Sequence, residues 1–258
     1  MRSILIITVL IFCSTIVIKA QIPDVLIEQG KELLNKGTNY SDVGYLIEAE
    51  QHFQQALDLD NTNFFAQYFL AYTDYRLAIY YMQTKDDEQF KNYIQLSIEE
   101  LKTILDSDDK DPEALALLAS DYGEKIREDS SLAPQLAPKA LSLISQVIEI
   151  APDNPRVQLL AGKLILTLPE KYGGNKVKAL VHLQKSVNLF QANREADDPI
   201  GWGYIFALTW LGINYTELND YTTAAKIYNK ALEVEPDFLW ITNVLLPDVE
   251  NKLNPPNE

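Results

Sequence analysis

Side chains that could carry out nucleophilic or metal chemistry are few in this sequence. It has two histidines, His52 and His182, and a single cysteine, Cys13. Nucleophilic catalysis by a cysteine–histidine pair, or a zinc site with nitrogen and sulfur ligands, needs several such residues in one place. The two histidines are far apart in the sequence, and each precedes a large apolar residue. We therefore interpret both as structural and predict that the protein is not an enzyme.

Two acidic segments and one glycine pair could be mistaken for ligand sites. The segments 86–88 and 106–111 are rich in carboxylates, but the second lacks the glycine and the later glutamate of a calcium-binding EF-hand loop. Gly173-Gly174 is not followed by the Lys-Ser/Thr pair of a phosphate-binding loop. We interpret all three as helix ends and turns, and we predict no metal and no cofactor.

The first twenty residues have the pattern of a secretory signal peptide. Arg2 precedes an apolar run over residues 4–18, and a small residue follows Lys19. A membrane-spanning helix needs about 20 residues, so this run is short for one. We predict a signal peptide over residues 1–20 and a mature chain of residues 21–258.

The predicted leader also bears on location. Cys13 follows Phe12, whereas a bacterial lipoprotein signal has a small residue at that place. We therefore expect an exported protein, periplasmic in a bacterium, with a lipid anchor or a membrane tether as the less favoured alternative. No second long apolar run follows, so we predict that the mature chain does not span a membrane.

The chain is strongly acidic, with 22 Lys and Arg against 37 Asp and Glu, for a net charge of −15. Cleavage after residue 20 would remove two basic residues, changing −15 to −17, and would leave no cysteine for a disulfide. Nucleic acid and anionic membrane surfaces would meet like charge, so we exclude them as partners. A basic or neutral partner fits this charge better.

The spacing of apolar residues predicts helices almost throughout. Glycine is sparse, with ten in the chain, and apolar residues recur at intervals of three and four rather than two. A long all-helical chain calls for a search for an internal repeat. Counted on a unit of about 34 residues, the segment 205–236 has apolar or small residues at the packing positions: Leu208, Leu211, Gly212, Tyr215, Ala224, Tyr228 and Ala231, with Pro236 at its end.

This pattern closely resembles the signature of the tetratricopeptide repeat (TPR), a hairpin of two antiparallel helices. Gly212 and Ala224 are small where the paired helices would cross closely, and Tyr228 is large enough to fill the space around that contact. Pro236 would end the second helix because proline cannot continue the hydrogen-bond ladder.

The same phase recurs more weakly upstream. The resemblance implies an all-α fold, a right-handed superhelical solenoid of about five TPR-like hairpins in a single domain. We place the hairpins at residues 23–60, 62–109, 111–152, 154–191 and 205–236, with a C-terminal capping helix at residues 237–253. Four turns between paired helices look stretched relative to a standard repeat: Gly37–Val43, Gln83–Glu88, Gly123–Ala137 and Pro169–Asn175.

In TPR proteins, certain positions of each first helix face a concave groove in which extended partner segments lie. The resemblance carries this role to Phe65, Tyr68, Tyr72, Tyr75 and Arg76 in the second unit, to Gln158 in the fourth, and to Phe206, Thr209, Ile213 and Thr216 in the fifth. Tyrosine rings would give a groove large contact area at low entropic cost, and arginine could hold a carboxylate. The alternative is that these rings pack against the first repeat. Trp202 and Tyr204 would close the groove or cap the helix start.

Two functions remain open. The first is an exported, non-enzymatic TPR scaffold that binds a protein or peptide segment, within a membrane transport or envelope complex, by analogy with the family. The second is a periplasmic small-ligand-binding accessory protein of a transporter, because residues 168–180 (LPEKYGGNKVKAL) resemble a motif of the T-component of TRAP transporters.

Overall fold

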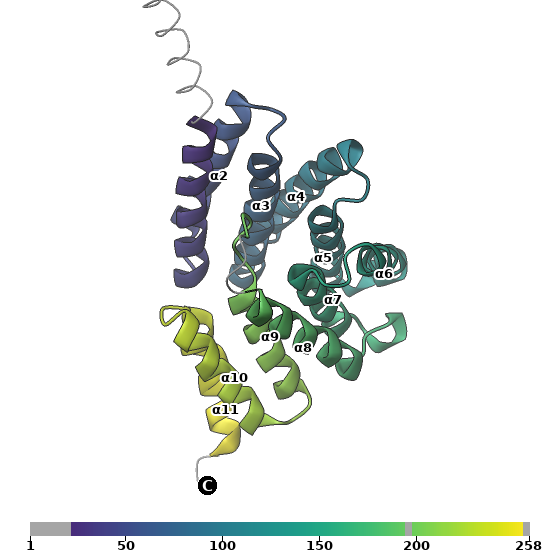
Figure 1. The fold of residues 1–258 in the computed structure, drawn as a ribbon. Coiled ribbons are helices and arrows are strands. Elements are labelled where there is room, and N and C mark those ends of the chain that lie inside the picture. Colours follow the sequence, from purple (N-terminus) through teal and green to yellow (C-terminus); the bar gives the residue numbers. More distant parts are fainter. Residues whose placement is uncertain (1–21, 194–197, 255–258) are drawn as a thin grey trace, which may run out of the picture.

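The computed structural model describes residues 22–193 and 198–254, and this part of the chain is helical without any strand (Figure 1). The predicted all-α helical-repeat fold is confirmed. The predicted signal peptide, residues 1–20, lies outside the described residues. No helix among the described residues has both the length and the apolar character needed to cross a bilayer.

The helices form five antiparallel pairs and a C-terminal segment. The first helix covers residues 22–40 and pairs with α2 (Val43–Leu59). The later pairs are α3 (Phe64–Thr84) with α4 (Asp87–Ser107), α5 (Pro112–Glu128) with α6 (Ala133–Ile150), α7 (Pro155–Thr167) with α8 (Lys176–Ala192), and α9 (Tyr204–Glu217) with α10 (Tyr221–Val234).

Short polar side chains fix where most of these helices begin. A residue that starts a helix can accept a hydrogen bond from a backbone N–H of the first turn, which has no partner within the helix. Seven Asp and Asn residues do so: Asp42, Asn63, Asp86, Asp111, Asn154, Asn175 and Asp220. The helix starts are therefore encoded locally in the sequence.

Glycine on one helix of a pair faces a large side chain on the other. A Cβ at Gly30 would lie 2.6 Å from the Phe53 ring, and one at Gly162 would lie 2.6 Å from Leu183. A Cβ at Gly212 would overlap the ring of Tyr228. The close helix crossing inferred at Gly212 therefore recurs in the first and fourth pairs.

Three of the four long turns predicted from the sequence are wrong. The paired helices are extended instead, and the connections shrink to residues 41–42, 85–86 and 129–132. Gly37 and Gly123 lie inside helices, where a Cβ would come within 2.7 Å of Leu46 and Leu164. These glycines provide close contacts rather than turns. The fourth, Pro169–Asn175, is a true connection and contains a short 3₁₀ helix at Glu170–Tyr172.

The first helices of successive repeats form an inner layer. Contacts run from α3 to α5, from α5 to α7 and from α7 to α9, while α4, α6, α8 and α10 lie outside them (Figure 1). Inner helices are buried nearly all round, as the long apolar stretch of α3 predicts, whereas outer helices bury one stripe. A side chain of an inner helix therefore faces either the core or the concave side.

The array curls until its two ends meet, with the first hairpin next to α10 (Figure 1). Lys31 Nζ donates to the carbonyl of Pro199 at 3.0 Å, and Asn39 Nδ2 donates to the Glu235 carboxylate at 3.2 Å. These contacts span most of the sequence. The concave side is thus a narrow interior and not an open groove.

The C-terminal segment continues as a helix after a short break. A π-helical stretch at Ile241–Leu245 leads into α11 (Leu246–Leu253). Pro247 has no N–H to donate and its ring would clash with the Asn243 carbonyl, which accounts for the wider turn. Phe238 and Ile241 are buried against the last hairpin, as expected of a capping helix.

The core between α3, α4 and α5 contains two buried carboxyl groups. Asp74 is 2% exposed, Asp121 is fully buried, and one oxygen of each has no hydrogen-bond partner among the described residues. Ser97 Oγ donates to the other oxygen of Asp121 at 3.0 Å. Burial raises the pKa of both carboxyls well above the usual range, and the nearby carboxylates of Glu50 and Glu100 raise that of Asp74 further.

We predict that Asp74→Asn raises the free energy of unfolding at pH 7 by about 1–3 kcal/mol, because asparagine has no charge to desolvate. Folding raises the pKa of Asp74. The contribution of the Asp74 carboxyl to the free energy of unfolding is therefore fully present below its pKa in the unfolded chain, about 3.9, and is lost as pH rises through its pKa in the folded protein. The gain should therefore be larger at pH 7 than at pH 4 in urea unfolding followed by circular dichroism.

The matched control is Asp109→Asn at an exposed turn, which should change stability by less than about 0.5 kcal/mol at either pH. If Asp74→Asn raises the free energy of unfolding equally at the two pH values, the raised pKa of the buried Asp74 carboxyl is contradicted.

Candidate functional site

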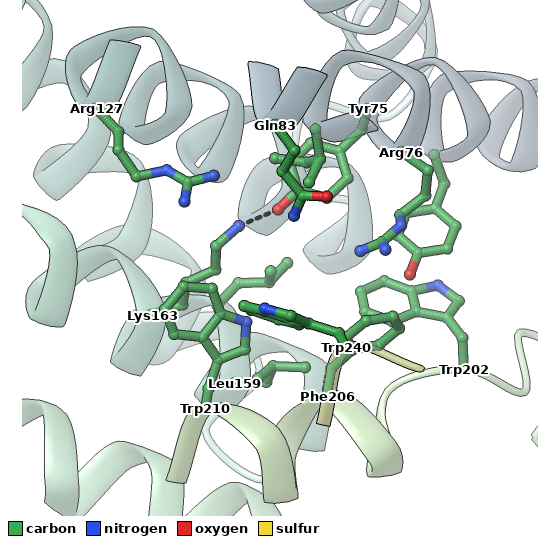
Figure 2. A pocket seen from close by; sticks show the side chains of 13 residues that line it. Tyr75, Arg76, Gln83, Arg127, Leu159, Lys163, Trp202, Phe206, Trp210 and Trp240 are labelled. Atoms are coloured by element: carbon green, nitrogen blue, oxygen red, sulfur yellow. Dashed lines mark hydrogen bonds between the residues drawn. The ribbon is translucent and has the colours of Figure 1, made fainter. Parts of the chain in front are cut away.

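Early, middle and late segments of the described chain come together around a pocket inside the curled array (Figure 2). We call it the inner pocket. Its empty space, including space open to solvent, is about 520 Å³, and the cavity itself is small, about 40 Å³. It is lined by Tyr72, Tyr75, Arg76, Ile79, Gln83, Arg127, Leu159, Leu160, Lys163, Trp202, Phe206, Trp210 and Trp240.

Helix α3 supplies one wall of the inner pocket. Tyr72, Tyr75, Arg76 and Ile79 recur at intervals of three and four, so they share one face of the helix. The rings of Tyr72 and Tyr75 stack with their centroids 6.0 Å apart. Only the rim residue of this wall, Gln83, is exposed to solvent.

The segment before α9 closes the pocket on a second side. The Trp202 ring stacks on Tyr72 with 4.2 Å between centroids and 10° between planes. Gly203, the next residue, allows Trp202 to approach Tyr72, because its φ of 127° is an angle that residues other than glycine rarely adopt. Phe206 packs edge-on to Trp202 and lies under the Arg76 guanidinium, 4.6 Å from it.

Arg156 on α7 holds this segment in place. Its Nη1 donates to the Trp202 carbonyl at 3.0 Å, and its guanidinium pairs with Asp198 at 2.7 Å. Its Nε donates to the buried Glu113 carboxylate at 2.9 Å. Opposing charges on both sides keep Arg156 charged although it is buried, because they raise its pKa against the effect of burial.

A buried charge network lies at the opposite end of the pocket. Lys163 forms an ion pair with Glu124, and Arg127 Nε donates to the same carboxylate at 2.7 Å. Lys163 also donates to the Tyr75 hydroxyl and lies 4.8 Å from its ring centroid (Figure 2). Burial alone would raise the pKa of Glu124, but the two cations lower it and keep it ionised.

The rings and the cations converge on the same space. Figure 2 shows three rings along one side of the inner pocket, those of Trp210, Trp240 and Phe206. The charged ends of three cations point into the pocket from its other sides: Arg76, Arg127 and Lys163. No carboxylate lines the inner pocket among the described residues. In a chain of net charge −15 this is a local concentration of positive charge.

The pocket opens beside the C-terminal segment. A shallow depression, which we call the mouth, shares Gln83 and Trp240 with the inner pocket and is completed by Ser41, Leu239, Asn243 and Val244. Trp240 stands where the π-helical stretch begins, and π-helical turns often mark functional sites. Val244 is one of the more exposed apolar residues of the described chain.

Comparison with known proteins agrees with the repeat pattern. The family model described as tetratricopeptide repeat matches residues 33–63 and 207–238, the first and last hairpins. The chain is a tetratricopeptide-repeat protein. The TPR fold is typical of a scaffold for interaction between proteins.

Solved structures share the fold of this TPR protein. A thermophilic TPR protein from Thermus thermophilus is 19% identical, with a TM-score of 0.59 over 86% of this chain and 98% of that one. The HusA haemophore from Porphyromonas gingivalis is also 19% identical, with a TM-score of 0.59 over 76% of this chain and 94% of that one. No curated protein matches the sequence.

The ten residues predicted to face a groove in the TPR array occupy three environments. Tyr72, Tyr75, Arg76 and Phe206 line the inner pocket. Tyr68, Gln158 and Thr209 are buried in the packing, where Gln158 donates to the carbonyl of Pro152 and Thr209 to that of Ile205. The half-buried Phe65, Ile213 and Thr216 lie outside the inner pocket.

The pattern of the repeat did not reveal the other pocket residues. Lys163 had a visible signal, because it is a lone cation in the apolar stretch LLAGKLIL of α7. Trp202 was noted as a residue that closes the groove or caps a helix, and its ring does pack across the concave side. Trp210 and Trp240 had no signal that separates them from core residues.

The two histidines contribute to packing and lie outside the pocket. His52 Nδ1 donates to the carbonyl of Glu48 at 2.9 Å, and His182 Nδ1 lies 2.8 Å from Gln158 Oε1. Within the described chain, no group of three His, Cys, Asp or Glu side chains could hold a metal ion. The groups that line the inner pocket are aromatic rings, cations, aliphatic side chains and the amide of Gln83.

We predict that Arg156→Met destabilises the protein by about 3–5 kcal/mol, because it leaves the buried Glu113 carboxylate without its cation. It should also release Trp202 and shift tryptophan emission to longer wavelength. Urea unfolding and fluorescence measure the two effects.

The double variant Arg156→Met with Glu113→Gln removes both charges and should recover part of the lost stability. A single variant as stable as the native protein, or a double variant no better than the single one, would contradict the importance of this buried pair.

Proposed function

We propose that this TPR protein is an exported, non-catalytic binding protein that recognises a partner protein through the inner pocket and its mouth. The supporting observation is the convergence of six aromatic side chains and three cations from α3, α5, α7, the segment before α9, α9 itself and the C-terminal segment. Aromatic and arginine side chains in a partly enclosed site are the groups that dominate protein recognition.

The proposed mode of binding differs from that of an open groove, in which an extended peptide lies along the concave side. Tyr68, Gln158 and Thr209 are buried in the helix packing, so these positions of the concave side are not available to a partner. A partner would instead insert one or two side chains past Gln83 and Trp240. Because the space inside is small, Trp240 and the π-helical stretch would move aside when the partner enters.

Site-specific photo-crosslinking in the native host tests this proposal. A photo-reactive residue at Gln83 or Val244, both at the mouth, should crosslink to the same protein. The control is Val181 on the outer helix α8, which is 62% exposed. The crosslink should weaken when Trp240→Ala is added. Equal crosslinking at Val181, or none at the mouth, would count against a partner at this site.

A second candidate is a small-ligand carrier. Residues 168–180 led to the expectation of a small-ligand-binding accessory protein of a transporter, and the pocket's rings add the idea of a planar ligand. The similarity in fold to a haemophore favours a tetrapyrrole. Because the interior is small, such a ring would meet the indoles of Trp210 and Trp240 only after Trp240 and the π-helical stretch move aside, and its carboxylates would then meet the cations of the pocket.

Titration of the purified protein with haemin tests the carrier. If it is correct, absorbance should saturate at one equivalent, and Arg76→Gln should weaken binding about tenfold or more. Lys178→Gln at the start of α8 removes an equal charge outside the pocket and should leave binding unchanged. A change that does not saturate, or that is the same in both variants, would exclude this carrier function.

A further inference from the structure

The three cations of the inner pocket are not equivalent. Lys163 and Arg127 share the Glu124 carboxylate, so one negative charge serves two positive ones. Arg76 has no carboxylate within 4.0 Å among the described residues. Because no acid lines the pocket, its charged side chains and Glu124 leave an excess of two positive charges.

Hydrogen bonding separates Arg76 from the other two cations in the same way. Lys163 donates to the Tyr75 hydroxyl and to Ser120 Oγ, and Arg127 donates to Glu124. Arg76 Nε is buried and has no hydrogen-bond partner in the described chain. A buried donor without a partner on a charged group is costly, so it marks a place where an acceptor is missing.

The surroundings of Arg76 define the shape of that acceptor. Its guanidinium lies over the Phe206 ring, 4.6 Å from the centroid, so an anion would have to approach the edge of the guanidinium plane. Guanidinium edges bind oxyanions through two parallel hydrogen bonds. Figure 2 shows the indole of Trp240 beside Phe206, on the side toward which Arg76 points.

From this geometry we infer that the inner pocket binds an anionic aromatic group, with Arg76 holding the anion and the rings of Phe206, Trp210 and Trp240 holding the flat apolar part. A side-chain-sized group of this chemistry suits the small interior. It can come from a free aromatic acid or from an anionic group next to an aromatic side chain of a protein. The inference rests on the pocket being the binding site of the proposed function, and it names what that site selects.

The excess positive charge also explains how an acidic protein can bind an anion. Charges on the outside are screened beyond about 8 Å at physiological ionic strength. Inside the partly enclosed pocket the nearest charges are Arg76, Arg127 and Lys163, and low-dielectric rings surround them. The local field therefore favours an anion although the whole chain has a net charge of −15.

A matched pair of probes tests the inference. The native protein should bind 2-naphthoate at least about tenfold more tightly than neutral 2-naphthamide, measured by titration calorimetry, because only the acid carries the charge. Arg76→Gln should reduce the affinity for the acid to that for the amide. Arg76→Lys should restore part of the preference, since it keeps the charge but loses the planar pair of donors.

Two controls keep the result specific. Lys178→Gln, outside the pocket, should leave the preference for the acid unchanged, and circular dichroism should show that each variant is folded. A peptide arm distinguishes the sources: a short peptide with Trp-Asp should bind more tightly than one with Trp-Asn if a protein can present the group.

Equal affinity of the native protein for acid and amide, no binding of the acid, or a preference that survives Arg76→Gln would each overturn the inference. These outcomes are separate from the crosslinking result. Crosslinks at the mouth without a preference for the acid would support the proposed partner and contradict the inference that the pocket selects an anionic group. A preference for the acid without crosslinks would support the anionic ligand and count against a protein partner at the mouth.

Discussion

The stack of Trp202 on Tyr72 is the contact on which the inner pocket depends. It joins the segment before the last hairpin to the second hairpin, and it turns an open array into a closed one. A ring stack alone is a modest interaction. Here Arg156 fixes the backbone of Trp202 and is itself held by Glu113 and Asp198, so the stack has little freedom to shift. The wall formed by Trp202 and Tyr72 is therefore set before any ligand arrives, which lowers the entropic cost of binding.

Closing the array changes what a TPR fold can recognise. An open solenoid presents a long concave surface that suits an extended segment. In this chain the ends of the array meet, and the concave side retains the inner pocket, with the mouth next to it beside Trp240. Such a site can distinguish the shape and charge of a small group more sharply than a flat groove can, because the group is desolvated and enclosed. The similarity to a haemophore and to a thermophilic TPR protein, at equal TM-scores, shows that one fold accommodates different proteins.

The distribution of charge differs between the outer surface of the array and the inner pocket. Most acidic residues of the described chain are at least partly exposed, and several begin helices, as Asp42 and Asp220 do. Cations gather at the pocket, where Glu124 compensates Lys163 and Arg127 only in part. Maintaining this arrangement requires a rigid frame, because like charges that are close and partly buried repel strongly. Tyr75 contributes to the frame by accepting a hydrogen bond from Lys163.

The sequence by itself determined the helical hairpins, because their signals are local. Asp and Asn start the helices, proline follows the last repeat, and small residues such as Gly212 face large ones such as Tyr228 at a fixed spacing. The resemblance to the TPR family predicted ten residues on the concave side, of which Tyr72, Tyr75, Arg76 and Phe206 line the inner pocket. Only the tertiary structure decided that the array closes and that Arg127, Lys163, Trp210 and Trp240 join these residues. The physical reason is that curvature accumulates from small rotations between repeats, and no single repeat encodes where the two ends will meet.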